Sequence, residues 1–214
     1  KDIVIYVSIA ISLVFSIALF MVLPTFLTKG AEKIGTLIPP ISAFTDSHLF
    51  TSLFEGIIRM VIFIGYLAIV SNMKDIKRVF QYHGEHKTIA CYEAGEELTV
   101  ENIKKHTRFH PRCGTSFLLF VMIVSILLFA LLPRVDMVIL RVLMRLALLP
   151  AVAGISFEII KFAGRSKSKW VAWLSKPGLW LQKLTTREPD ASQIEVAIES
   201  MKPCIPENKE DDRW

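Results

Sequence analysis

The sequence predicts an all-α, polytopic membrane protein with about four transmembrane helices and a cytoplasmic helical loop that is rich in histidine and cysteine. Two observations carry this prediction. Of the 214 residues, 52% are hydrophobic and the mean hydropathy is positive, which is typical of membrane proteins rather than of soluble domains. The apolar residues are also clustered into blocks, and about 20 apolar residues in a helix are enough to cross the hydrocarbon core of a bilayer.

Four apolar blocks are predicted to span the bilayer or to insert deeply into it. The first, residues 3–27, contains no charged residue, and it is too long for a signal peptide and has no small-residue cleavage site. We expect this helix to end within residues 24–28 and to be followed by a surface loop that contains Pro39 and Pro40. The remaining three blocks are residues 49–70, 117–132 and 135–162.

Lysine and arginine are distributed unevenly between the connections. Residues 72–116 and the tail after Lys161 are rich in both, whereas residues 28–48 contain only Lys29 and Lys33. By the positive-inside rule, both termini and residues 72–116 are predicted to be cytoplasmic, in the inner membrane of a bacterium. The lipid bilayer is therefore the first predicted partner.

The chain divides into four segments on this basis. They are two transmembrane helices with an outer loop (1–71), a cytoplasmic helical His/Cys loop (72–116), two further transmembrane helices (117–163), and an interfacial and cytoplasmic tail (164–214).

The net charge of +5 is interpreted as a topology signal. Acidic residues interrupt every basic run, so no specific nucleic-acid site is predicted. A cytosolic setting keeps thiols reduced, so Cys91, Cys113 and Cys204 are not expected to form disulfides.

The second and fourth blocks carry charged residues at helical spacing. Glu55 and Arg59 are four residues apart, and so are Arg141 and Arg145. A charge in mid-membrane costs at least about 2.5–3.5 kcal/mol, so it should face protein or water, unless a residue such as Arg59 snorkels to the interface. Because three arginines face one glutamate, these four residues predict a hydrated, positive groove. Pro150 is expected to kink the fourth helix.

The hydrophilic segments are predicted to be largely helical. Residues 73–93 have helical periodicity, and Thr99 can cap a short helix that Pro111 terminates. Residues 169–184 contain three tryptophans among lysines, which is typical of a segment lying on the inner leaflet.

Residues 82–113 contain four of the five histidines and two of the three cysteines. Imidazole and thiolate are ligands that transition metals prefer. One interpretation is a site for zinc or iron with three protein ligands and one water, and with Glu85 or Glu93 as the catalytic base. The alternative is that these side chains hold the loop by hydrogen bonds or face anionic lipid. The predicted metal ligands are His83, His86, His110 and Cys113.

The chain contains short motifs at residues 82–89, 91–93, 98–102, 110–117, 152–156 and 185–189. Together they resemble the motifs of the YqhQ-like family of bacterial membrane proteins. The resemblance implies a predicted metal-dependent enzyme in which His83, Glu85, His86, His110 and Cys113 have roles, and it leads us to expect a glycine-rich segment ahead of residue 1. The family motif has a small residue between Gly84 and Glu85, which is absent here and shortens the histidine spacing.

Three functions are compatible with these features. The first is a factor that assists membrane-protein biogenesis, with the positive groove receiving a polar stretch of a client and the loop docking on a translocon or ribosome. The second is a metal-dependent hydrolase at the cytoplasmic membrane surface. The third is a lipid- or ion-handling protein. We favour the first, because charges in the membrane are costly and need a function, whereas the loop residues can be structural.

Overall fold

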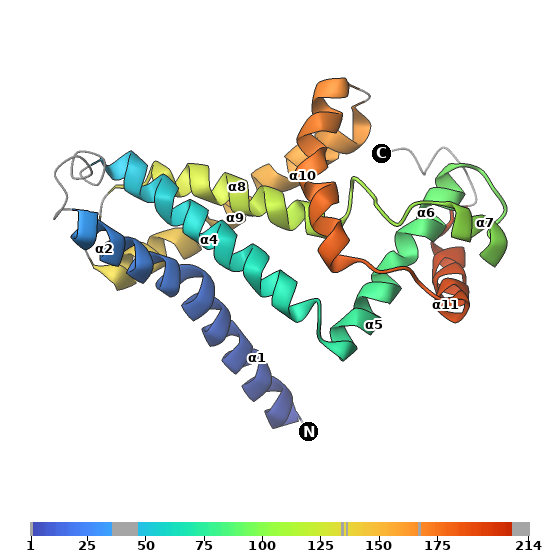
Figure 1. Ribbon diagram of the computed structural model, residues 1–214, viewed down its shortest axis with the longest axis horizontal. Coiled ribbons are helices and arrows are strands. Elements are labelled where there is room, and N and C mark those ends of the chain that lie inside the picture. Colours follow the sequence, from blue (N-terminus) through green and yellow to red (C-terminus); the bar gives the residue numbers. More distant parts are fainter. Residues whose placement is uncertain (1, 36–46, 134, 136, 167, 207–214) are drawn as a thin grey trace. The chain divides into compact units, whose positions relative to one another are not determined.

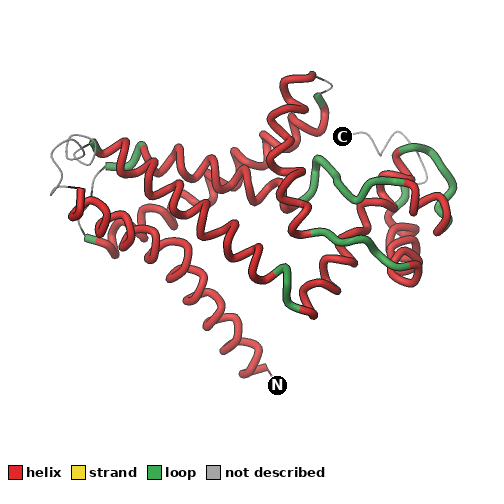
Figure 2. Tube along the Cα trace, viewed as in Figure 1, coloured by secondary structure: helices red, strands yellow, loops and turns green. Residues whose placement is uncertain are grey.

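The computed structural model describes residues 2–35, 47–133, 135, 137–166 and 168–206. Every regular element within these ranges is helical, and they contain no strand (Figure 2). Three helical segments are long and apolar enough to cross a membrane: Ile3–Gly35, α4 (His48–Val70) and α9 (Val138–Arg165). A further apolar helix, α8 (Gly114–Ala130), has only 17 residues. The all-α fold class is confirmed, with three candidate spans and the shorter α8.

The first helix is longer than predicted. α1 (Asp2–Ile17) continues through a π-helical turn, Ala18–Val22, into α2 (Leu23–Gly35), so the predicted end within residues 24–28 is wrong (Figure 1). Pro24 has no N–H, and it therefore leaves the carbonyl of Phe20 without its helical donor. Arg59 Nε donates to that carbonyl at 2.9 Å, so the carbonyl is satisfied and the helix can continue. The predicted loop with Pro39 and Pro40 lies outside the described residues.

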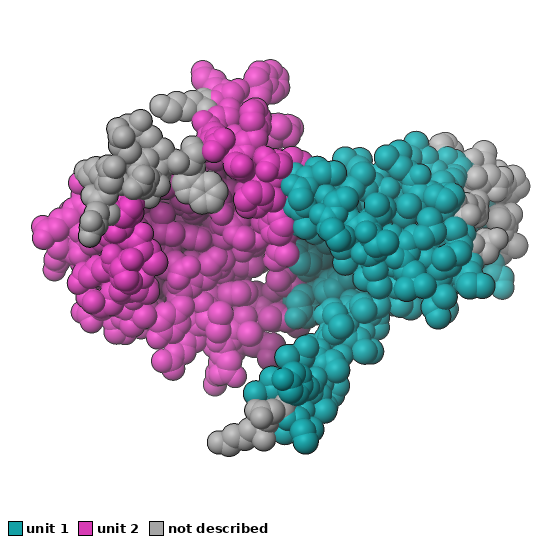
Figure 3. Space-filling view, turned by 180° about the vertical axis from the view of Figure 1, so that it is seen from behind, with its two compact units in different colours: residues 1–66, 121–156 teal, residues 67–120, 157–214 magenta. Residues whose placement is uncertain are grey.

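The chain forms two compact units (Figure 3). Unit 1 comprises residues 1–66 and 121–156. In unit 1, a Cβ atom placed on Gly56 of α4 would lie 2.6 Å from the side chain of Ile126 on α8. The absence of a side chain at Gly56 therefore allows these two helices to pack closely.

Unit 2 comprises residues 67–120 and 157–214. Its helices are α5 (Lys74–Tyr82), α6 (His86–Glu93), α7 (Val100–Lys105), α10 (Lys169–Thr185) and α11 (Ala191–Met201), with 3-10 turns at His83–Glu85 and Lys202–Cys204.

A small apolar core holds α6, α7 and α11 together. Its buried members are Cys91, Ile103, Ile194 and Ile198. The predicted cap is confirmed, because the Thr99 hydroxyl accepts a hydrogen bond from the backbone N–H of Asn102. Asp190 and Gln193 form a capping box that starts α11.

The predicted helix over residues 73–93 is interrupted by the 3-10 turn at His83–Glu85. A Cβ atom on Gly84 would lie 2.6 Å from the carbonyl oxygen of Arg187 and 2.7 Å from Pro189. The Arg187 N–H also donates to the Phe80 carbonyl at 2.7 Å. The segment after α10 therefore packs directly on this turn, and only glycine leaves room for it.

Candidate functional site

Three of the predicted metal ligands meet in unit 2. His83 lies in the 3-10 turn, His86 begins α6, and Cys113 directly precedes α8. One ligand atom from each side chain lies within 4.8 Å of the other two, and His83 Nε2 is 3.2 Å from Cys113 Sγ. His86 and Cys113 are buried and His83 is partly buried. We call these three residues the His/Cys cluster.

Backbone carbonyls determine the tautomers of both histidines. His83 Nδ1 is 2.8 Å from the Thr185 carbonyl oxygen, and His86 Nδ1 is 2.9 Å from that of Arg108. A carbonyl oxygen only accepts, so each Nδ1 carries the proton and donates it. In a neutral ring the lone pair is therefore on Nε2, and in a protonated His83 the same nitrogen donates to the Cys113 sulfur at 3.2 Å. A metal-bound histidine is oriented by the same kind of outer hydrogen bond from its other nitrogen.

The surroundings of Cys113 favour its thiolate. Burial raises the pKa of this thiol, but hydrogen bonds with His83, His86 and Thr115 together lower it to about 5. The Thr115 N–H is 3.3 Å from the sulfur. The hydrogen bond between His83 and Cys113 also raises the pKa of His83. Cys113 lies at the N-terminus of α8, where the positive end of the helix dipole further stabilises a thiolate.

His110 lies beside the His/Cys cluster rather than within it. Its ring centroid is 5.6 Å from that of His86. Its Nδ1 accepts from the Arg112 N–H at 3.3 Å, so the proton of the neutral ring is on Nε2, which is buried and lies 3.6 Å from a carboxylate oxygen of Glu93. Burial lowers the pKa of His110, which favours this neutral form. In this arrangement neither nitrogen offers a lone pair to a metal.

Gln182 of α10 holds the backbone at His110. Its side-chain oxygen accepts from the His110 N–H at 2.9 Å, and its amide nitrogen donates to the His110 carbonyl at 2.7 Å and to the Ser116 hydroxyl at 2.9 Å. Gln182 is fully buried. A fully satisfied buried amide of this kind fixes the geometry of the polypeptide around it.

The two predicted bases differ in position. Glu93 is half-exposed, approaches His110 and forms an ion pair with Arg112. Glu85 follows His83 in the 3-10 turn, but its side chain points outward and is exposed. Of the two carboxylates, Glu93 is the one that lies near a histidine of the site, with a carboxylate oxygen 3.6 Å from His110 Nε2.

Sequence reasoning missed the residues that support the cluster. Thr185 and Arg108 act through backbone carbonyls, which carry no sequence signal. Glu188 accepts hydrogen bonds from Lys87 at 2.8 Å and from Arg108, and these two cations lower the pKa of its carboxyl group. The family motif at residues 185–189 was the only available signal for this segment.

A second group of potential ligands in unit 2 is formed by Cys91, Glu96 and His106. Cys91 is fully buried in the apolar core, and burial raises the pKa of its thiol. Its sulfur donates to the carbonyl of Glu97. Burial and this hydrogen bond favour the protonated thiol, and Cys91 packs as a member of the apolar core.

The four predicted groove residues also meet, in unit 1. Glu55 accepts hydrogen bonds from Arg59 at 3.1 Å, from both terminal nitrogens of Arg145, and from the Thr25 hydroxyl at 2.9 Å. Arg141 is 4.0 Å from the same carboxylate and donates to a backbone carbonyl. Glu55, Arg59 and Arg145 are each at most 5% exposed, so they form a buried ionic cluster.

A pocket of about 30 Å³ adjoins this ionic cluster, which is room for a few water molecules. Glu55, Arg141 and Arg145 line it, together with Glu32 and His48. His48 starts α4, and Leu132 and Pro133 of the lining follow α8. The pocket therefore lies at the helix ends predicted to be outside.

Comparison with known proteins identifies relatives of this chain. A family model described as "Protein of unknown function (DUF1385)" matches residues 1–207. The chain is 41% identical over 201 residues to the uncharacterized protein YqhQ of Bacillus subtilis (strain 168). This match covers 91% of the chain and 60% of the relative, so the chain spans about 60% of that relative's length. No solved structure matches. The family match over nearly the whole chain shows that the protein belongs to the DUF1385 family, as its YqhQ-like motifs indicated.

Proposed function

We propose that the protein is a membrane-embedded, metal-dependent hydrolase in which His83, His86 and Cys113 bind zinc or iron. One observation supports the proposal: two histidines, whose Nδ1 atoms are bound to backbone carbonyls, lie with a ligand atom of Cys113 within 4.8 Å of one another. Three protein ligands, with a water molecule at the fourth position, are typical of catalytic zinc sites, and histidine and cysteine are both zinc ligands. We prefer this function to the biogenesis role that the sequence favoured, because the buried arginines are largely paired with Glu55.

The protein side chains around such a centre have separable tasks. A bound zinc ion supplies a Lewis acid and lowers the pKa of a bound water to about 7. Glu93 is the proposed general base, because its carboxylate is half-exposed and close to His110. His110 Nε2 lies 3.6 Å from a Glu93 carboxylate oxygen, and Gln182 holds the backbone of His110 in place. The substrate is an ester, amide or phosphoester of a lipid or protein at the membrane surface.

Glu93→Gln is expected to lower hydrolytic turnover by about 10²- to 10⁴-fold while metal content stays unchanged, because a positioned base contributes that much. The measurement is product formation by mass spectrometry from bacterial membrane lipids and membrane proteins, using zinc-loaded protein. Glu101→Gln, an exposed glutamate of α7, is the matched control and should keep full turnover. Equal activity of both variants would show that Glu93 is not the base. The absence of any zinc-dependent product would argue against a hydrolase.

A biogenesis factor is the second candidate, and the pocket beside the ionic cluster favours it. Arg141 is the least buried of the three arginines, at 20% side-chain exposure, and it lines the pocket. Arg141→Gln should leave the fold intact and weaken photo-crosslinking to nascent membrane proteins, translocon or ribosome. Arg165→Gln, an exposed residue at the end of α9, is the control. If Arg141→Gln instead loses a bound anionic lipid, the lipid-handling alternative is indicated. If neither the crosslinking nor the bound lipid changes, the pocket has no part in the function.

We further propose that the protein resides in the bacterial inner membrane with both termini and residues 72–116 in the cytoplasm. The uneven distribution of lysine and arginine supports this orientation. In a variant without native cysteines, a cysteine introduced in residues 30–35 should react with a membrane-impermeant maleimide in intact cells. A cysteine at Glu101 should react only after permeabilisation. The reverse pattern would invert the topology.

A further inference from the structure

Helix α10 has the opposite polarity from an ordinary helix at a protein surface. Its outward face carries four large apolar side chains that are 57–80% exposed: Trp170, Trp173, Leu174 and Trp180. Its inward face contains one large apolar residue, Leu181, and several small or polar ones, Ser175, Gly178, Gln182 and Thr185, all buried. In water the apolar side chains of a helix turn inward, so this helix is suited to an apolar environment on its outer side.

Polar groups of the inward face form hydrogen bonds with His83 and His110 of the candidate site. The Thr185 carbonyl accepts from His83, and Gln182 binds both the N–H and the carbonyl of His110. A Cβ atom on Gly178 would lie 2.7 Å from the Ser116 hydroxyl oxygen, so α10 passes very close to the start of α8. These contacts determine which face of α10 turns outward, and the tryptophans cannot rotate inward without breaking them.

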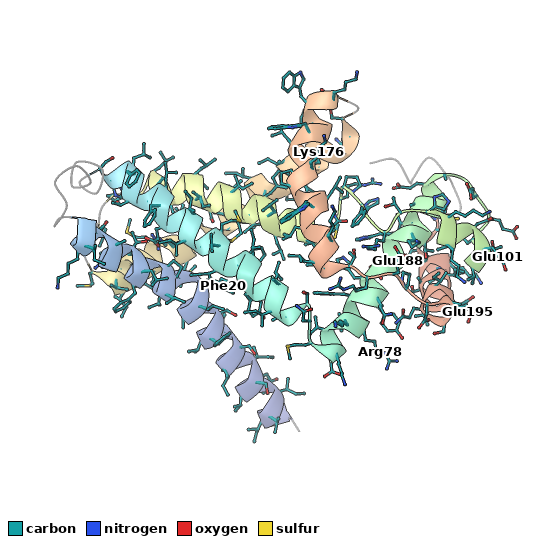
Figure 4. The ribbon with its side chains drawn as sticks, in the orientation of Figure 1. Phe20, Arg78, Glu101, Lys176, Glu188 and Glu195 are labelled. Carbon is teal, nitrogen blue, oxygen red and sulfur yellow. The ribbon has the colours of Figure 1, made fainter. Side chains whose placement is uncertain are left out.

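The charges of α10 identify what covers its outward face. At 100° per residue, Lys169, Lys176 and Lys183 form one row directly beside the tryptophans, and all three are exposed. Lys176 is marked on this helix in Figure 4. α10 contains no acidic residue. Tryptophan rings beside a row of lysines match the headgroup region of a bilayer that contains anionic lipid.

We propose that α10 lies in the plane of an anionic bilayer surface, with Trp170, Trp173 and Trp180 in the headgroup region and its lysines on lipid phosphates. The same helix supports the His/Cys cluster and His110 from its other face. The lipid contact therefore holds α10 in the orientation that the site requires. This surface does not depend on whether a metal binds.

Single-tryptophan variants in lipid nanodiscs test this proposal. The chain has four tryptophans, so three are replaced by phenylalanine and either Trp170 or Trp173 is kept. The retained tryptophan should lose most of its emission when the lipids carry bromine near the headgroups, and it should be shielded from aqueous iodide. Glu101→Trp in a tryptophan-free background is the control, because it lies beside Lys104 and Lys105 on α7, and it should show the reverse.

The lipid charge is tested with Lys169→Gln, Lys176→Gln and Lys183→Gln combined. In nanodiscs with anionic lipid, this triple variant should lose part of the iodide shielding and resemble the unsubstituted protein in purely zwitterionic lipid. Tryptophans that iodide reaches and brominated lipid does not quench would show a water-exposed face and overturn the proposal. Tryptophans shielded from both quenchers would show a protein surface, such as a second copy, and would overturn it equally. Metal content measured on the same samples keeps this result separate from the proposed hydrolase.

Discussion

Cys113→Ser and His86→Ala are each expected to remove a stoichiometric zinc or iron ion from the purified protein. A site of three protein ligands that loses one keeps two, which is too few to hold the ion through purification. The outer hydrogen bonds to Thr185 and Arg108 stay in place in Cys113→Ser, so this variant removes a ligand without disturbing the histidine tautomers. Elemental analysis of protein purified without chelators is the measurement.

Two histidine variants separate metal ligands from their neighbours. His106→Ala should retain the metal, because His106 lies in the group around Cys91 and not in the His/Cys cluster. His110→Ala should also retain it, because His110 directs its Nε2–H toward Glu93. Metal loss in His110→Ala would return His110 to the ligand set that the sequence predicted. A wild-type protein without bound metal and without zinc affinity would contradict the proposed function.

Glu55→Gln is expected to destabilise the protein by about 3–5 kcal/mol, the usual cost of removing one partner from a buried ion pair. Three arginines converge on this carboxylate, and an amide accepts fewer hydrogen bonds and carries no charge to balance Arg59 and Arg145. The low dielectric of the membrane interior increases this cost. The measurement is the free energy of unfolding in mixed micelles, or the thermal midpoint where unfolding is irreversible.

Glu158→Gln is the matched control for the ionic cluster. Glu158 also lies on a candidate span and also pairs with a cation, Lys161 at 3.8 Å, but its side chain is 69% exposed. An exposed pair contributes at most about 1 kcal/mol, so this change should be small. Equal effects of the two variants would show that the buried cluster is not what holds unit 1 together. Adding Arg145→Met to Glu55→Gln should recover part of the loss, since it removes an unpaired charge.

The helical elements of this protein were predictable wherever the signal is local. Apolar length located the three candidate spans and α8, and the Thr99 cap was correct because a capping hydroxyl acts on the next turn of its own chain. The predicted end of the first helix was wrong because of a contact with a distant part of the chain. Pro24 normally ends a helix, but here Arg59 from α4 satisfies the carbonyl that Pro24 leaves unpaired.

For the candidate site, too, residue types could be read from the sequence, whereas contacts between distant residues could not. Residue type and clustering were enough to select His83, His86 and Cys113, because few side chains bind transition metals. They could not separate His110 from that set, since all three histidines look alike in sequence. The difference is in the second nitrogen: carbonyls accept from Nδ1 of His83 and His86, whereas the Arg112 amide donates to Nδ1 of His110.

The sequence by itself determined the fold class, the candidate spans and the chemical character of the site, because these follow from composition, hydrophobic length and side-chain type. Only the tertiary structure decided which imidazole nitrogens are free, which carboxylate faces the site, and that three arginines share Glu55. These properties depend on backbone carbonyls and on contacts between residues up to more than 100 positions apart, such as His83 with Thr185. A one-dimensional pattern contains no information on which backbone groups a folded chain brings to a given ring.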